Sequence, residues 1–217
     1  MKIGIIGGTG REGKGLAVRW SKAGHDVVIG SRDASRAAEV AEELNAEFGV
    51  SLRGADNAGC CEGAEVVLLA IPFSGHEATL TALRDALQGK ILIDITVPLQ
   101  PPKVRSVNLP EGDSAALRAQ AILGEGVRVV GALHHISSDH LMNLEHQFDC
   151  DVLVCGNDPE ARATVVSLVK DLGIRAFEAG VLKNAIALES LTPVLLFINQ
   201  KYKADGAGIR LVGLGES

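Results

Sequence analysis

Short apolar segments recur along the chain and predict the strands of a buried sheet. They cover residues 2–7, 26–31, 65–72, 90–96, 127–133, 151–156 and 174–180. Val, Ile and Leu occupy both faces of most of these segments. Strands that are apolar on both faces are typical of the centre of a parallel sheet, because helices cover both of its sides.

Segments with helical spacing lie between most of these strands. They cover roughly residues 11–23, 33–48, 75–87, 114–122 and 159–172. Asp33 and Ser74 stand where the second and third of these helices would need an N-cap. Alternation of strands and helices predicts an α/β sheet with right-handed crossovers.

One segment without periodic apolar positions interrupts this alternation. Residues 96–113, "TVPLQPPKVRSVNLPEGD", hold four of the seven prolines. Proline-rich stretches of this length form neither helix nor central strand, so we expect a long ordered loop. Loops this long in a compact domain are commonly functional.

The end of the chain has a different pattern. Residues 182–202, "LKNAIALESLTPVLLFINQKY", predict a helix that is apolar around much of its surface and that Pro193 kinks or interrupts. Little chain remains to cover it, so we expect a partner subunit and a homodimer. Residues 207–214, "AGIRLVGL", are expected to be extended. This pattern divides the chain into 1–180 and a C-terminal helix and tail, 181–217.

A glycine-rich loop directly follows the first predicted strand. In "GGTGREGKG", residues 7–15, Gly8, Gly10 and Gly13 have the spacing G-x-G-x-x-G. Between a strand and a helix, this spacing allows a tight turn, a close approach to a pyrophosphate, and close helix packing. The sequence therefore predicts a Rossmann-type doubly wound, mostly parallel sheet with a small C-terminal helical extension, binding a dinucleotide in residues 1–180.

The end of the second strand indicates which dinucleotide is bound. NAD-preferring sites place an acid there, whereas this chain has Ser31 and Arg32, with Arg36 one turn later. A guanidinium binds a 2'-phosphate with paired hydrogen bonds, and an acid would repel it. Asp33 comes too late in the sequence and is predicted to cap the helix. NADP(H) is therefore favoured over NAD(H), and Arg11 is a further candidate phosphate contact.

Charge and composition exclude several classes of function. The formal net charge is −6, which argues against nucleic-acid binding. The apolar runs are too short to span a membrane, and a strand starting near residue 2 leaves no room for a signal peptide. The four cysteines form no C-x-x-C pair, so we expect reduced thiols and a cytoplasmic protein. The histidines lack metal-ligand spacing, and no metal is expected.

The nicotinamide end of the site lacks an obvious general acid. Asp94 ends a buried strand and is more typical of a backbone cap than of a proton donor. His134 is equally compatible with a place beside the reacting groups and with a supporting role, while His135 and Lys183 fit polar or surface positions better. Hydride transfer to a carbonyl needs a proton donor, whereas transfer between two redox cofactors needs mainly stacking and orientation. We therefore assign no catalytic residue.

Several motifs together resemble one family. They are "IGGTGREGKGLAVRWSKAGHDVVIGSRDASRA", "LAIPF", "GALHHIS", "FDCDVLVCGND", "ALESLTPVLLFIN" and the terminal "AGIRLVGL". This set is similar to the NADPH-dependent reductases of the deazaflavin coenzyme F420, nearly from end to end. The late motifs are not general features of dinucleotide-binding proteins, which makes the resemblance specific.

The resemblance implies a role for each region. Thr9, Gly10, Arg11 and Glu12 would surround the pyrophosphate, and Ser31, Arg32 and Arg36 the 2'-phosphate. Ile71 and Pro72 would line the nicotinamide ribose, Ser138 would hold the carboxamide through its backbone, and coenzyme F420 would lie near His134 with Ala207 closing over it. Hydride would pass directly between the two cofactors. The open alternatives are a reductase of a flavin, quinone, metal chelate or imine, and an NADPH sensor without turnover.

Overall fold

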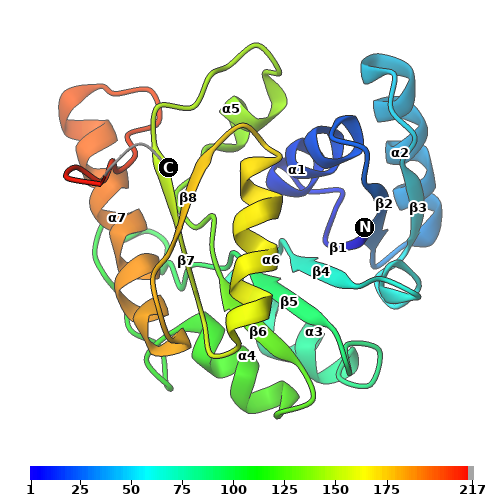
Figure 1. The fold of residues 1–217 in the computed structure, drawn as a ribbon, viewed down its shortest axis with the longest axis horizontal. Coiled ribbons are helices and arrows are strands. Elements are labelled where there is room, and N and C mark those ends of the chain that lie inside the picture. Colours follow the sequence, from blue (N-terminus) through cyan, green and yellow to red (C-terminus); the bar gives the residue numbers. More distant parts are fainter. Residues whose placement is uncertain (215–217) are drawn as a thin grey trace.

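Eight strands form one sheet in the order β3-β2-β1-β4-β5-β6-β7-β8 in the computed structural model, which describes residues 1–214 (Figure 1). Residues 215–217 of the predicted C-terminal segment lie outside the described part. The strands are β1 (Lys2–Ile6), β2 (Asp26–Ser31), β3 (Arg53–Asp56), β4 (Val66–Leu69), β5 (Ile91–Asp94), β6 (Arg128–Gly131), β7 (Asp151–Gly156) and β8 (Arg175–Glu178).

Helices cover both faces of this sheet, as expected for strands that are apolar on both sides. They are α1 (Arg11–Lys22), α2 (Ala34–Phe48), α3 (His76–Ala82), α4 (Ala115–Leu123), α5 (Ser138–Met142), α6 (Pro159–Lys170) and α7 (Ala185–Tyr202). One core cluster joins the sheet to α1, α2, α5 and α6, and the other joins it to α3, α4 and α7. Ile5 and Ile6, neighbours in β1, belong to opposite clusters, which is the alternation that a strand imposes. No helix among the described residues is both long and apolar enough to cross a membrane.

The chain changes direction across the sheet at β1. β1 pairs in parallel with β2 on one side and with β4 on the other, so the chain first runs outward to β3 and then returns to continue from β4. Ligands of doubly wound sheets bind where the strand order reverses, at the carboxyl ends of the strands. The predicted fold class is confirmed, and the glycine loop lies at this position.

Two strands, β7 and β8, run opposite to the other six. β6 and β7 are antiparallel, with Val130 opposite Gly156 and Gly131 opposite Cys155. The connection through α5 remains at the end of the sheet where β6 finishes. β7 therefore starts at that end and runs in the direction opposite to β6. β7 and β8 are then parallel to each other, joined by α6. The sheet is therefore mostly parallel, as predicted, but the sequence did not indicate which strands run in the opposite direction, because apolar faces do not encode strand direction.

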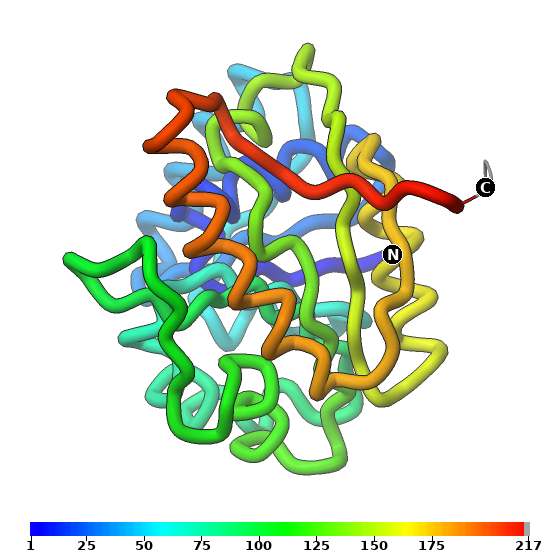
Figure 2. Tube along the Cα trace, turned by 90° about the vertical axis from the view of Figure 1, so that its left-hand side faces the viewer, coloured from blue at the N-terminus to red at the C-terminus, as the bar shows by residue number. Residues whose placement is uncertain are grey.

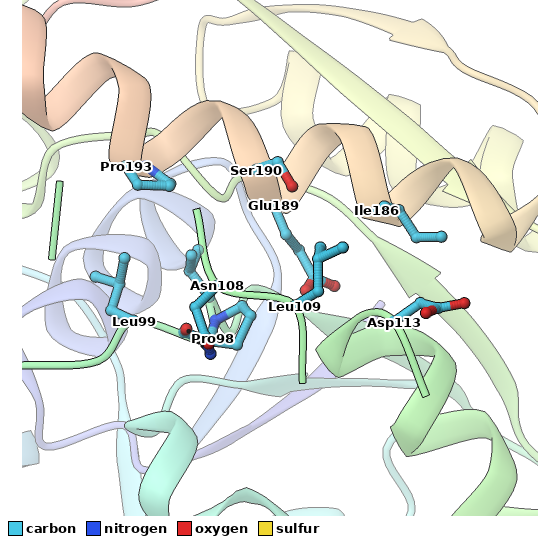
Figure 3. A pocket seen from close by; sticks show the side chains of 10 residues that line it. Pro98, Leu99, Asn108, Leu109, Asp113, Ile186, Glu189, Ser190 and Pro193 are labelled. Atoms are coloured by element: carbon cyan, nitrogen blue, oxygen red, sulfur yellow. Dashed lines mark hydrogen bonds between the residues drawn. The ribbon is translucent and has the colours of Figure 1, made fainter. Parts of the chain in front are cut away.

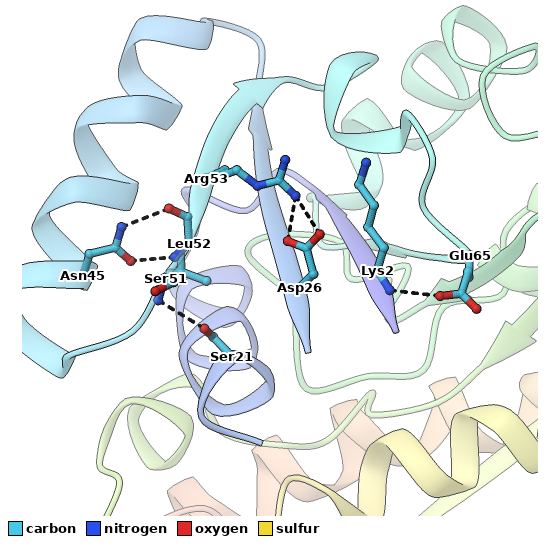
Figure 4. Close-up of polar contacts among 8 residues, drawn as sticks. All are labelled: Lys2, Ser21, Asp26, Asn45, Ser51, Leu52, Arg53 and Glu65. Carbon is cyan, nitrogen blue, oxygen red and sulfur yellow. Dashed lines mark hydrogen bonds and ion pairs between the residues drawn. The ribbon is translucent and has the colours of Figure 1, made fainter. Parts of the chain in front are cut away.

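The edge strand β3 was missed by the sequence analysis because its residues, "RGAD", are mostly polar. Polar contacts hold it in place (Figure 4). Arg53 donates to both carboxylate oxygens of Asp26 in β2, at 2.6 and 2.8 Å. Asn45 of α2 exchanges two hydrogen bonds with the backbone of Leu52, at 2.7 and 2.9 Å. The strand is therefore specified by its neighbours in space.

Two local predictions need correction. The predicted helix 75–87 is α3, only His76–Ala82, and it follows a 3-10 turn over Phe73–Gly75. Ser74 lies inside that turn and does not cap the helix, which has no side-chain cap. The Asp33 cap is confirmed, because its carboxylate accepts from the amides of Ser35 and Arg36. The short helix α5 was not predicted.

The proline-rich loop lies against the C-terminal helix. Residues 96–113 contain no helix or strand, as expected. They close a small pocket against α7, in which the Glu189 side chain points from the helix toward the loop (Figure 3). α7 continues through Pro193, which is buried, so the helix is not interrupted there.

The chain after α7 turns back and crosses the β7 side of the molecule (Figure 2). The amide of Asp151 donates to the carbonyl of Ile209 at 2.8 Å, and the amide of Leu211 donates to the Asp151 carboxylate at 2.6 Å. Residues 207–214 contain no assigned helix or strand, and the trace of this tail is drawn out along the molecule, as predicted (Figure 2), with a bend at Gly213.

Candidate functional site

The glycine loop ends in a helix whose first turn is open to a ligand. Gly10 is the N-cap of α1, and no side chain of the described residues caps this end. The amides of a first helical turn have no partner within the helix, and they carry the positive end of the helix dipole. Such an end binds phosphate.

The three glycines of the motif differ in what surrounds them. A Cβ on Gly8 would lie 2.7 Å from Cβ of Ile29 in β2, and one on Gly13 would lie 2.7 Å from the Gly8 Cα. Both positions therefore exclude a side chain for reasons of packing. A Cβ on Gly10 would meet nothing closer than the Gly7 carbonyl oxygen, at 3.3 Å, and Gly10 is exposed. Its missing side chain leaves space at the site.

The residues proposed for the 2'-phosphate lie together after β2. Ser31 is the last residue of β2, and Arg32 and Arg36 are exposed. Arg36 forms ion pairs with Glu39 and Glu43 of the same helix, at 3.4 and 3.9 Å. The Arg32 side chain has no hydrogen bond or ion pair to another described residue. Arg32 is therefore the guanidinium that a ligand can bind without breaking an existing contact.

A cleft with a cavity volume of about 330 Å³ lies beside the glycine loop at the carboxyl ends of β1, β4, β5 and β6. Its walls are mostly apolar. They are formed by Gly10, Arg11, Glu12, Ala70, Ile71, Pro72, Phe73, Ile95, Thr96, Val97, Leu99, Leu133, His134 and Thr192.

Six of the residues singled out from the sequence line this cleft: Gly10, Arg11, Glu12, Ile71, Pro72 and His134. The sequence analysis missed Thr96 and Thr192, which line the same cleft. Thr96 had a weak signal, since it follows the strand end at Asp94. Thr192 had none, because it reaches the cleft from α7, and its hydroxyl donates to the His134 carbonyl at 2.8 Å.

His134 is neutral at physiological pH in this environment. Burial lowers its pKa from 6.5 to about 4, an effect that the nearby Asp94 carboxylate only partly opposes. Since the folded state takes up this proton less readily than the unfolded state, His134 contributes stability above about pH 6.5. That stability is lost as the pH falls toward 4. The backbone before it is constrained, with Leu133 at φ 61°, a left-handed conformation that is uncommon for leucine.

Two polar side-chain atoms at the cleft are buried without a partner among the described residues. They are Thr96 Oγ1 and His134 Nε2. A buried polar atom without a hydrogen bond costs about 1–3 kcal/mol. Polar atoms left open in an apolar cleft are what orients a bound planar molecule.

Helix α5 lies against α1 beside the glycine loop, and none of its residues is among those that line the cleft. The Arg19 guanidinium of α1 donates to the carbonyls of Leu141 and Asn143, at 2.8 and 2.7 Å, and so fixes α5 against α1. Ser138 is the first residue of α5. Asp139 of α5 forms an ion pair with Arg11 of the glycine loop.

Other candidates lie away from the cleft wall. The Ala207 amide donates to the Asn199 side chain at 2.7 Å, in the tail that follows α7. Lys183 is exposed in a 3-10 turn before α7, as the sequence analysis expected of a surface residue. Asp94 accepts from the Thr96 amide at 2.9 Å, which confirms the predicted backbone cap.

No group of three or more metal-ligating side chains occurs among residues 1–214.

A larger open groove, of about 650 Å³, lies at the amino end of β6. Gln120, Arg128 and Asp158 are among its lining residues. It contains none of the predicted site residues and lies away from the strand ends where the glycine loop opens. The smaller cleft is therefore the candidate site.

Comparison with known proteins identifies related sequences over the whole chain. Residues 2–98 match a family model described as "NADP oxidoreductase coenzyme F420-dependent". The F420-dependent NADP reductase of Methanothermobacter thermautotrophicus is 38% identical, over 100% of this chain and 97% of that protein. Metalloreductase STEAP3 of Rattus norvegicus is 30% identical over 90% of this chain, which corresponds to 37% of that longer protein.

A solved structure agrees with this relationship. The crystal structure of an Arthrobacter sp. FB24 protein, provisionally described as an F420-dependent NADP reductase, superposes with a TM-score of 0.85. It is 28% identical, and the match covers 98% of this chain and 99% of that one. The similarity thus extends beyond the glycine motif to α7 and the tail, and the chain belongs to the family of F420-dependent NADP reductases.

Proposed function

We propose that this protein is an oxidoreductase that transfers hydride between NADPH and coenzyme F420. The observation that carries the proposal is the cleft itself, which joins an uncapped phosphate-binding helix end to apolar walls at the switch point of the sheet. The names of the full-length relatives support the same reaction.

The glycine loop and the end of β2 would hold NADP(H). The loop residues Gly8, Thr9, Gly10 and Gly13 would surround the pyrophosphate with backbone groups, together with Arg11 and Glu12. Ser31, Arg32 and Arg36 would bind the 2'-phosphate. The pyrophosphate is assigned to the loop because the helix end there is uncapped. The 2'-phosphate is assigned to the end of β2 because the Arg32 guanidinium has no partner among the described residues.

The cleft would orient the two reacting rings. When both are bound, NADPH supplies the hydride and coenzyme F420 accepts it. Ile71 and Pro72 would bound the nicotinamide side, and the Ser138 backbone would face its carboxamide. Apolar walls exclude water, and close stacking turns hydride transfer into a reaction within one complex. The neutral His134 would shape the pocket and offer hydrogen bonds, since at neutral pH it does not carry the proton of an acid.

Residues 1–180 would act as the NADP-binding domain, and 181–217 as the segment that completes the second substrate's site. α7 supports this division, because Thr192 already reaches the cleft and binds the His134 carbonyl. Ala207 and its neighbours would close over coenzyme F420 by a movement of the tail. A cytoplasmic location stays a prediction.

The reaction is tested by mixing purified protein with NADPH and oxidised coenzyme F420 and following loss of the deazaflavin's visible absorbance. NADH, free FMN and a ferric chelate serve as comparison substrates. We expect fast bleaching with NADPH and F420 only. Tight NADPH binding without bleaching would rule out the substrate assignment.

A metal-chelate reductase is the second candidate, because the similarity to a metalloreductase extends over most of this chain. Reduction of the ferric chelate with no reduction of F420 would favour it. Binding of NADPH without reduction of any acceptor would favour a sensor.

His134 provides a first prediction within this proposal. Since it is neutral and lines the cleft, the His134→Ala variant should raise the KM for coenzyme F420 several-fold while kcat stays within about twofold. Steady-state kinetics at saturating NADPH between pH 6 and 8 check this. A large fall in kcat that varies with pH across that range would instead indicate that His134 handles a proton.

We further propose that the protein is a homodimer formed through α7. One side of α7 is buried in its own chain, but Val194 and Phe197 are 46% and 53% exposed on the other side. Val107 and Leu109 of the proline-rich loop are also about half exposed. Large exposed apolar side chains that gather in one region are typical of interfaces.

The dimer is tested by its dependence on this surface. Val194→Asp together with Phe197→Asp should shift the protein from dimer to monomer in sedimentation velocity, because two charges would be buried in the interface. Lys183→Asp, an exposed change before α7, is the matched control and should leave the dimer intact. A wild-type monomer at micromolar concentration would contradict the proposal.

A further inference from the structure

The most deeply buried contact between a carboxylate and a basic side chain among the described residues lies directly behind the cleft. His76 Nε2 donates to Asp94 Oδ2 at 2.7 Å, and the two side chains are 1% and 0% exposed. In every other such contact of the described residues, at least one side chain is 12% or more exposed. Burying a carboxylate is costly unless it is hydrogen-bonded, so the fold keeps Asp94 in this position only with well-placed donors.

Asp94 uses both of its carboxylate oxygens. While Oδ2 accepts from His76, Oδ1 accepts from the Thr96 amide at 2.9 Å. His76 is the first residue of α3 and directly follows the 3-10 turn Phe73–Gly75, which in turn follows Ile71 and Pro72. One carboxylate therefore contacts two segments of chain.

These two segments form neighbouring walls of the cleft. Residues 70–73 come from the end of β4, and residues 95–97 come from the end of β5. The sheet pairing of β4 with β5 ends at Leu69 and Asp94. Beyond that pair, the Asp94–His76 contact is the hydrogen bond of the described residues that joins the two walls.

The charge of Asp94 also affects the pKa values of two nearby side chains, Glu189 and His134. Burial raises the pKa of the Glu189 carboxyl to about 8, and the Asp94 charge adds to this in the same direction. The same charge opposes the lowering of the His134 pKa that burial causes. Glu189 has its own hydrogen bonds, to the amides of Ala115 and Ala116 at the start of α4. The Glu189 carboxyl group therefore accepts hydrogen bonds from the start of α4 and does not connect the cleft walls.

We propose that Asp94 is a positioning residue that, through His76, fixes the separation of the two walls in which the hydride donor and acceptor meet. This inference rests on the proposed function. Displacing reacting groups by about 1 Å can cost about 100-fold in rate. The phosphate-binding elements follow β1 and β2 and do not depend on this contact, so the Kd for NADPH should change little even though Ile71 and Pro72 would bound its nicotinamide.

Two substitutions separate geometry from charge. Asp94→Ala removes both hydrogen bonds. Asp94→Asn can keep both without the charge, because the amide oxygen can accept from the Thr96 amide and the NH2 group can donate to an imidazole nitrogen of His76. If the role is positioning, the Asn variant should rescue what the Ala variant loses.

The experiment combines three measurements on wild type and both variants. Stopped-flow absorbance gives the rate of hydride transfer from NADPH to F420, fluorescence titration gives the Kd for NADPH, and hydrogen exchange with mass spectrometry follows the wall segments 70–76 and 95–99. For Asp94→Ala we expect a rate about 100-fold lower, a Kd within threefold of wild type, and faster exchange in both walls. Asp94→Asn should stay within about fivefold of wild type in rate, with exchange unchanged.

The proposal is overturned if Asp94→Ala keeps both the rate and the exchange pattern of wild type. It is equally overturned if Asp94→Asn is as impaired as Asp94→Ala, since charge would then matter rather than position. If Asp94→Ala lacks a cooperative melting transition, His76→Phe breaks the same connection with a ring of similar size, and the same rate and exchange results are expected. A wild type that does not reduce F420 contradicts the proposed function alone, because hydrogen exchange still tests the connection between the walls.

Discussion

Replacing Arg32 by alanine should weaken the binding of NADPH by about 10- to 100-fold while the affinity for NADH stays within twofold. Arg32 is exposed directly after β2, and it has no polar partner among the described residues. A charge-assisted hydrogen bond contributes about 1.5–3 kcal/mol, and NADH lacks the phosphate that would receive it. Isothermal titration calorimetry with both nucleotides measures the two affinities.

Two further variants define the mechanism of this effect. Arg32→Lys keeps the charge but not the paired hydrogen bonds, so its NADPH affinity should fall between those of wild type and Arg32→Ala. Arg84→Ala, an exposed arginine after α3, is the distant control and should change neither affinity. Equal weakening of NADPH and NADH by Arg32→Ala would contradict the assignment of the 2'-phosphate site.

Replacing Gly10 by alanine should reduce NADPH affinity at least about 30-fold while leaving the fold almost unchanged. A Cβ at Gly10 would meet only the Gly7 carbonyl oxygen closely, at 3.3 Å, a tight contact that a shift of a few tenths of an ångström would relieve, and Gly10 has φ −73°, which alanine adopts readily. The methyl group would instead occupy the space through which the backbone approaches a pyrophosphate. NADPH titration and thermal unfolding are measured on the same sample.

Gly8→Ala is the informative counterpart. Its Cβ would lie 2.7 Å from Cβ of Ile29 and 3.0 Å from the Ile5 carbonyl oxygen, both in the core. Overpacking of this kind costs about 1–3 kcal/mol, so Gly8→Ala should lower the melting temperature clearly. Unchanged NADPH binding in folded Gly10→Ala would show that the pyrophosphate does not lie over this residue.

Local sequence patterns were sufficient where one segment carries all the information. The apolar runs predicted seven of the eight strands, because a buried strand needs apolar side chains on both faces along its own length. The Asp33 cap could be predicted for the same reason, since a cap and the amides that it binds are neighbours in sequence.

Other elements could not be predicted, because distant residues specify them. β3 is held by Asp26 and Asn45, and α5 is fixed by Arg19 of α1. Neither segment is apolar or periodic enough to indicate a strand or helix by itself. The reversed direction of β7 depends on where the connection after β6 ends, which no pattern within β7 records.

For the site, the sequence by itself determined the spacing of Gly8, Gly10 and Gly13 and the absence of an acid after β2, because both depend on residue type at fixed positions along one βαβ unit. Only the tertiary structure decided what surrounds the reacting groups. It brings Thr192 from α7 against His134, lowers the His134 pKa by burial, and joins Asp94 to His76 behind the cleft. These properties arise because side chains from separate strands and helices are buried against one another on folding. They therefore depend on packing that no single segment encodes.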